Sequence, residues 1–128
     1  MDISKLDKVF SIYIRRRDAD EYGRVKCCTC DMVTHWSEMD CGHWMINRPN
    51  TTRWDEENCH PQCKKCNRHY DGEWVKHRDY IIDRHGFDAM YELGHKSQRP
   101  IKMMQHEIDE MVQVYKEKIK QLDNQLLT

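Results

Sequence analysis

Two pairs of cysteines constrain the fold of this chain more than any other feature. Cys27 and Cys30 form one pair and Cys63 and Cys66 the other, with two residues inside each pair. Four thiolates spaced in this way are the ligand set of a closed tetrahedral zinc site. The 32 residues between the pairs exceed the spacing in a minimal zinc finger, so they should form structure of their own. We therefore predict a small domain built around one structural Zn²⁺ ion.

The cysteines have two competing uses, disulfide bonds and a redox dithiol. The chain has seven cysteines, an odd number, and its N-terminal sequence lacks the apolar stretch and cleavage site of a secretory signal. These features favour metal-bound thiolates in a reducing compartment, and we expect a cytoplasmic protein. Cys28, Cys41 and Cys59 are left without a role. Cys28 leaves the register of the first pair open, although only Cys27 reproduces the spacing of the second.

Length and composition set broad limits on function. A chain of 128 residues forms one small domain, with or without an appendage, and buries only a modest core. Charged residues make up 34% of the sequence, and no apolar run approaches the length of a membrane span. The net charge is −1, so the composition gives no general argument for nucleic-acid binding. Any such argument depends on local residues.

Apolar periodicity predicts helices on both sides of the cysteine-rich region. Residues 3–17 form an amphipathic helix with a basic end, 24–46 read as a short antiparallel hairpin, and 47–58 as a loop. A helix over 74–85 ends at Gly86, and a shorter one precedes Gly94. These elements suggest an N-terminal helix (1–24), a zinc-containing core (25–86) and a C-terminal helical extension (87–128).

A narrow apolar stripe runs along the C-terminal helix, which is expected from Pro100 onward. Its members recur at steps of three and four residues: Ile101, Met104, Ile108, Met111, Tyr115, Ile119, Leu122 and Leu126. We expect part of this stripe, within 100–126, to pair two chains into a homodimer. The alternative is that it folds back onto the N-terminal helix of the same chain.

The order of motifs resembles a known enzyme family. Cys-x-x-Cys, Gly-His, Asn and Cys-x-x-Cys-Asn follow one another as in the zinc-containing branch of the HNH, or ββα-metal, nucleases. LDKVFSIYIRRRD, VKCCTC, DCGHWMINR and DEENCHPQCKKCNRHYDG are similar to the NinG/Rap recombination endonucleases of lambdoid phages. The resemblance runs from Leu6 to Gly86.

The resemblance implies an α+β fold, with a small zinc-stabilised ββα-metal (HNH, His-Me finger) core flanked by an N-terminal helix and a long C-terminal helix. It also implies a DNA endonuclease dependent on Mg²⁺ or Mn²⁺. The expected substrates are branched recombination intermediates, including Holliday junctions, and the expected location is the host cytoplasm if the protein is phage-encoded.

The resemblance also suggests roles for residues between and beside the cysteine pairs. His43 is the candidate general base, since imidazole titrates near neutral pH. Asn67 would offer its amide oxygen to a hard cation, with Asp40 and His69 as further candidate ligands. Asn58 matches the middle residue of the HNH pattern, which orients the loop behind the base.

The chain departs from the HNH pattern at Gly42, where a ligand usually precedes the base. The nearest carboxylate is Asp40, about 7 Å further along a regular strand, and a bulge at Gly42 would shorten that distance. Asp40 has an ordinary alternative role as a turn residue, and His69 as a surface residue.

Basic residues near the proposed site are candidates for holding DNA phosphates. They are Arg15, Arg16, Arg17, Arg48, Arg53, Lys64, Lys65 and Arg68. The alternative is that these are solvated charges balanced by neighbouring acids. Two other functions remain open: a non-catalytic, zinc-stabilised DNA-binding module and a recombination adaptor that acts through its C-terminal helix.

Overall fold

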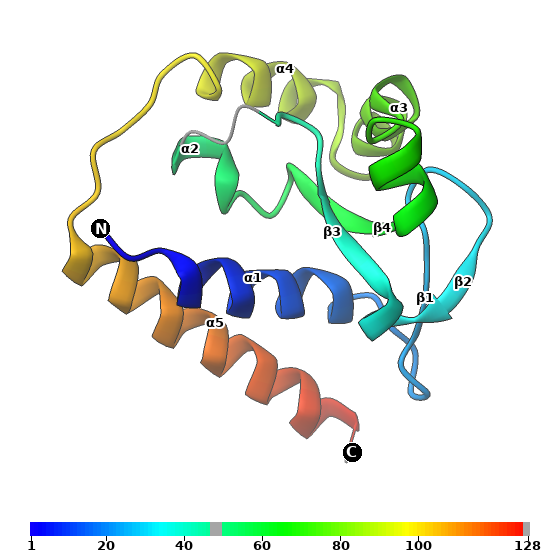
Figure 1. The fold of residues 1–128 in the computed structure, drawn as a ribbon, viewed down its shortest axis with the longest axis horizontal. Coiled ribbons are helices and arrows are strands. Elements are labelled where there is room, and N and C mark those ends of the chain that lie inside the picture. The colour runs from blue at the N-terminus through cyan, green and yellow to red at the C-terminus, as the bar shows by residue number, and fades with distance from the viewer. Residues whose placement is uncertain (47–49, 127–128) are drawn as a thin grey trace.

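A computed structural model describes residues 1–46 and 50–126 (Figure 1). The fold is α+β, with small two-stranded sheets between helices. In chain order the elements are α1 (Ser4–Arg16), β1 (Arg24–Lys26), β2 (Val33–His35), η1 (Trp36–Glu38), β3 (Met39–His43), α2 (Asn50–Arg53), β4 (Cys59–Cys63), η2 (Lys65–His69), α3 (Trp74–His85), α4 (Phe87–Lys96) and α5 (Gln105–Leu126).

The strands form two antiparallel hairpins. β1 pairs with β2, and β3 pairs with β4 in a continuous register from Met39 opposite Cys63 to His43 opposite Cys59. The sequence predicted one hairpin across 24–46, so the pairing of β3 with a strand beyond the loop is a correction. Pro61 lies in the middle of β4 and weakens the strand signal there.

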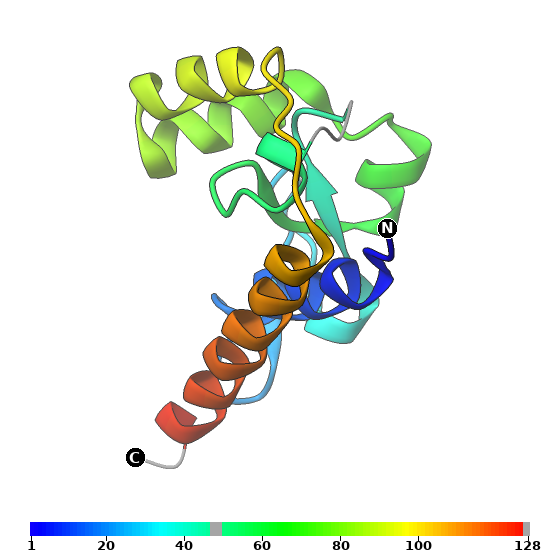
Figure 2. The ribbon, with the colours of Figure 1, turned by 90° about the vertical axis from the view of Figure 1, so that its left-hand side faces the viewer.

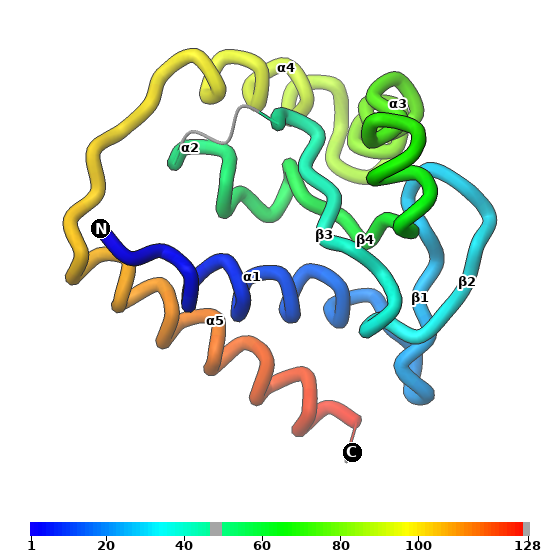
Figure 3. Tube along the Cα trace, viewed as in Figure 1, coloured from blue at the N-terminus to red at the C-terminus, as the bar shows by residue number. Residues whose placement is uncertain are grey.

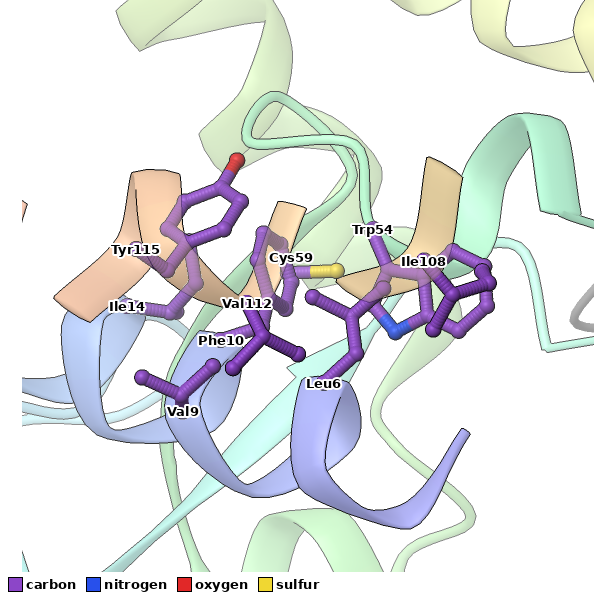
Figure 4. Packing of buried hydrophobic residues seen from close by; sticks show 9 residues of the cluster. All are labelled: Leu6, Val9, Phe10, Ile14, Trp54, Cys59, Ile108, Val112 and Tyr115. Atoms are coloured by element: carbon purple, nitrogen blue, oxygen red, sulfur yellow. The ribbon is translucent and has the colours of Figure 1, made fainter. Parts of the chain in front are cut away.

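Two helices cover one side of the β3–β4 sheet. α1 buries Leu6, Phe10 and Ile14, which recur every four residues and share one face of the helix. This face packs against Ile108, Val112 and Tyr115 of α5, and Trp54 and Cys59 join the same core cluster (Figure 4). Figure 2 confirms that α5 lies along α1, while α3 and α4 lie on the opposite side of the sheet.

In the single chain, the C-terminal helix α5 therefore folds back onto the N-terminal helix α1, which is the alternative stated for it above. Ile108 and Tyr115 of the predicted stripe are buried, whereas Ile101 and Leu126 are more than half exposed. The buried face also contains Val112, which the predicted stripe omitted. The helix begins at Gln105 instead of Pro100. A homodimer through the exposed part of this helix stays a prediction.

α3 and α4 form a helix pair joined at Gly86. This glycine has a φ of +98°, a left-handed conformation that favours glycine, and its N–H caps α3 by donating to Ile82. Trp44 packs with Ile81 of α3 and Leu93 of α4. α4 continues past the predicted end to Lys96. The connection from α4 then returns to the start of α1, where Gln105 and Asp2 exchange two hydrogen bonds of 2.9 Å (Figure 3).

The helix expected after the second cysteine pair is interrupted. Lys65–His69 forms one π-helical turn, and α3 begins only at Trp74. Asp71, Gly72 and Glu73 between them all have positive φ, which breaks the helix. Asn67 therefore lies on a short turn beside the sheet and not on a long helix.

None of the helices in the described residues has both the length and the apolar character needed to cross a membrane.

Candidate functional site

The four paired cysteines converge as the spacing predicts. The sulfurs of Cys27, Cys30, Cys63 and Cys66 all lie within 4.8 Å of one another. Cys27 and Cys30 lie in the turn after β1, Cys63 ends β4 and Cys66 lies in η2. This cluster therefore joins the two hairpins and η2.

Backbone amides around the cluster favour thiolates. The N–H groups of Cys63 and Thr29 point at the sulfur of Cys27, at 3.3 and 3.4 Å, and the N–H of Cys66 points at Cys63 at 3.4 Å. A hydrogen bond from the Cys28 side chain, together with the amides of Cys63 and Thr29, lowers the pKa of Cys27 to about 3. Burial raises the pKa of Cys66 to about 12, but a bound metal deprotonates a coordinating thiol. Four sulfurs with this arrangement of N–H donors fit a structural zinc ion.

A second feature lies beside the β3–β4 hairpin, on the side of α1. It is a pocket of about 310 Å³ that gathers residues from four elements. Three of the residues predicted for catalysis or cation binding, Asp40, His43 and Asn67, line it together. The other lining residues are Asp7, Phe10, Ser11, Cys41, Arg53 and Arg68.

The ring of His43 is oriented by the backbone. Its Nε2 lies 2.9 Å from the carbonyl oxygen of Arg53 at the end of α2. A carbonyl oxygen only accepts, so Nε2 carries the proton and Nδ1 of the neutral ring carries the lone pair. The geometry thus assigns the nitrogen that can act as a base or as a ligand.

Asp40 and Asn67 are in direct contact. The amide nitrogen of Asn67 donates to Asp40 at 2.9 Å, and Arg68 donates two hydrogen bonds of 2.9 Å to the same carboxylate. Partial burial works to raise the pKa of Asp40, but the bonds from Arg68 and Asn67 outweigh it and hold that pKa below its usual value. Because a carboxylate accepts hydrogen bonds, the amide oxygen of Asn67 is left for another partner, such as a cation.

The expected bulge at Gly42 is absent. The β3–β4 ladder is regular through this position, so Asp40 is not brought nearer to His43 along the strand. Gly42 has a different reason to be glycine, because a Cβ there would lie 2.3 Å from the side-chain oxygen of Gln62 on β4. Gln62 is wholly buried and donates to Thr29 and to the carbonyl of Gly72. Packing across the sheet thus explains why position 42 has a glycine and not a metal-binding side chain.

Asn58 and His69 lie outside this pocket. Asn58 is fully buried, accepts a hydrogen bond from the N–H of Met45 at 2.8 Å and donates to the carbonyl of Thr52 at 3.1 Å. It therefore ties together the two ends of the loop behind His43. His69 is exposed at the end of η2 and does not line the pocket.

The basic residues fall into three groups. Lys64, Lys65 and Arg68 are exposed on or beside η2. Arg15 and Arg16 lie over the ring of Trp36. Arg53 and Arg17 are bound within the fold: Arg53 pairs with Asp7, and Arg17 donates to the carbonyls of Glu56 and Cys59 at 2.9 Å. Arg48 lies outside the described residues.

Asp7 is a contributor to the site that sequence reasoning missed. Its carboxylate accepts two hydrogen bonds from the Arg53 guanidinium, at 2.8 and 2.6 Å, and one from the Trp54 indole at 2.9 Å. Asp7 therefore holds the residue whose carbonyl orients His43. The only signal in the sequence was an acidic residue beside the apolar face of α1, which is common on surface helices.

The chain resembles known proteins over most of its length. The family model described as bacteriophage lambda NinG protein matches residues 2–125. The chain belongs to the NinG family. Among NinG proteins, that of Salmonella phage P22 is 33% identical over 100 residues, covering 76% of this chain and 47% of the relative. The NinG protein of Escherichia phage 933W is 30% identical over 123 residues (95% and 58%), and that of phage lambda 29% over 123 residues (95% and 57%).

The chain spans about half the length of these NinG relatives. No solved structure matches it.

Proposed function

We propose that this NinG-family chain is a metal-dependent DNA endonuclease with a ββα-metal site. The supporting observation is the pocket in which His43, with its ring fixed by the Arg53 carbonyl, meets the contacting pair Asp40 and Asn67. β3 carries Asp40 and His43, and the turn η2 carries Asn67, in the chain order of the HNH pattern.

In this proposal His43 takes a proton from a water molecule through Nδ1. Nδ1 has almost no exposed surface, so side chains of the pocket must shift before water reaches it. The Arg53 carbonyl keeps the ring in one tautomer during that shift, because it continues to accept the hydrogen bond from Nε2–H. Asn58 keeps the loop behind the ring in place.

Asp40 and Asn67 would hold Mg²⁺ or Mn²⁺ through oxygen atoms. When bound, such an ion neutralises charge on the phosphoryl group and the leaving oxygen. Arg68 now pairs with Asp40, but its side chain is 60% exposed and has room to turn toward a DNA phosphate. Lys64 and Lys65 extend the same basic edge, so phosphate contacts are expected along η2.

Branched recombination intermediates such as Holliday junctions, in the cytoplasm of an infected cell, are the proposed substrates. They follow from the resemblance to NinG/Rap endonucleases and not from the pocket. The residues around the pocket contain no recognisable motif for reading base edges, which suits an enzyme that recognises the shape of DNA.

The test is incubation of an end-labelled four-way junction with the zinc-loaded chain, with and without Mg²⁺. Endonuclease activity predicts cut products that require Mg²⁺ and appear only on branched DNA. A non-catalytic binding module predicts a mobility shift without products. A recombination adaptor predicts neither on DNA alone.

A further inference from the structure

A second group of metal-binding side chains lies on the face of the β3–β4 sheet toward α1. Cys41 and His43 are two residues apart on β3, so they share one face, and Cys59 is directly opposite His43 on β4. One donor atom from each of the three lies within 4.8 Å of the other two. The four-cysteine cluster is defined by the same spacing of its donor atoms.

We propose that Cys41, His43 and Cys59 form a second metal site, separate from the four-cysteine site, that binds thiophilic divalent ions of the zinc class. With zinc–sulfur bonds of about 2.3 Å, two thiolates in a tetrahedral site lie ~3.8 Å apart. Donor atoms within 4.8 Å of one another need to move by only about 1 Å to reach this geometry. Two sulfurs and one imidazole select zinc, cobalt or cadmium over magnesium, which requires oxygen ligands.

The orientation of His43 matches that of a metal ligand. Histidines that bind metals usually donate their other ring N–H to a carboxylate or a backbone carbonyl. The bond from Nε2 of His43 to the Arg53 carbonyl is of this kind, and it leaves Nδ1 as the ring nitrogen with a lone pair for a metal. Asp7 supports the arrangement from α1 through its two hydrogen bonds to Arg53.

The charge of the complex and the access to the site also fit a bound metal ion. A divalent ion with two thiolates and a neutral imidazole forms a complex with zero net charge, which lowers the cost of placing it next to an apolar core. Cys59 is fully buried in that core (Figure 4). Cys41 and His43 line the pocket, which gives an ion a path of entry and leaves a fourth coordination position for water.

The ordinary alternative is that Cys41 and Cys59 act only as small apolar side chains, as buried free cysteines often do. The two interpretations differ in the number of ions bound. If His43 is the general base, an ion at this site also blocks catalysis, so excess zinc would inhibit cleavage. That consequence rests on the proposed function, whereas binding of the ion does not.

The experiment adds Co²⁺ to the 128-residue chain that already holds its one structural zinc. Bound cobalt is counted by elemental analysis after gel filtration and followed by thiolate-to-cobalt absorption. We expect about one additional cobalt per chain in the wild type and in His106→Ala, a control histidine at an exposed position of α5. Cys41→Ser should bind the added ion at least tenfold more weakly.

His43→Ala provides a second variant in case Cys41→Ser folds poorly, and it should lose the additional cobalt in the same way. Zinc content and circular dichroism report whether each variant is folded. A wild type that binds no cobalt beyond its zinc would overturn the proposal, as would folded Cys41→Ser and His43→Ala proteins that bind it normally. Cobalt that binds at this site without inhibiting cleavage would support the site and count against His43 as the base.

Discussion

The Nε2–H group of His43 donates a hydrogen bond to the backbone carbonyl of Arg53, with 2.9 Å between nitrogen and oxygen. The two residues come from β3 and α2, and the Arg53 side chain is in turn fixed by Asp7 on α1. An element outside the ββα unit thus determines which nitrogen of the candidate base carries the lone pair. Testable expectations follow for the structural zinc, the buried histidines, the contact between α1 and α5, and the pocket.

We expect one tightly held zinc ion per chain, and its removal should unfold the region around β1 and β4. Metal binding and folding share their free energy in such sites, so a strong chelator should abolish the cooperative thermal transition. Elemental analysis and circular dichroism before and after chelation measure both. A folded, zinc-free protein with an unchanged transition would contradict the assignment.

Asp40→Asn should raise the Mg²⁺ or Mn²⁺ concentration needed for half-maximal cleavage by about tenfold, because the cation loses a charged ligand. Zinc content should not change, since Asp40 lies outside the four-cysteine cluster. The measurement is a cation titration of junction cleavage. An unchanged midpoint would leave Asp40 only the role of holding Asn67 and Arg68 in place.

The chain should lose stability in mild acid through its buried histidines. His60 and His77 are fully buried, 2.9 Å apart between ring nitrogens, and His85 lies 3.0 Å from His60. Burial lowers the pKa of His77 to about 4, against about 6.5 in the unfolded chain. The unfolded chain therefore binds more protons between these values. The stabilisation by neutral His77 is complete above about pH 6.5 and is lost as the pH falls toward 4, on the order of 3 kcal/mol.

Urea unfolding at about pH 5 and pH 7.5 measures this effect, with zinc content checked at both pH values. His77→Gln should show a weaker pH dependence than the wild type. His106→Gln, at an exposed position of α5, is the matched control and should behave like the wild type. Identical pH dependence in the wild type and His77→Gln would count against the effect.

Ile108→Ala should destabilise the chain by about 2 to 5 kcal/mol, because it leaves a cavity between α1 and α5. Val114→Ala removes an apolar side chain from the exposed face of the same helix and should cost less than about 0.5 kcal/mol. Urea unfolding of both variants gives the comparison. Equal costs would mean that the α1–α5 contact contributes little in solution.

The sequence predicted the parts of the fold that depend on local periodicity or ligand spacing. The four cysteines and α1 are of this kind. The partner of β3 could not be predicted, because Cys59–Cys63 has a proline at its centre and none of the Val, Ile, Thr, Tyr, Phe or Trp residues that favour strands. The π-helical turn that carries Asn67 ends at a left-handed segment whose conformation only the tertiary structure reveals.

The candidate site residues followed from the resemblance to the HNH nucleases and not from local periodicity. His43, Asp40 and Asn67 line one pocket, as a shared site requires. The contribution of Asp7 depends on the packing of α1 against α2, a contact between residues 46 positions apart. Local patterns carry no information about such a contact.

The most direct test of the account is the rate of Mg²⁺-dependent junction cleavage by His43→Ala, measured beside His106→Ala as an exposed control. Both proteins should retain zinc and the wild-type thermal transition. Loss of the general base should slow cleavage by at least about a hundredfold in His43→Ala only. A folded His43→Ala protein that cuts at the wild-type rate would contradict the mechanism.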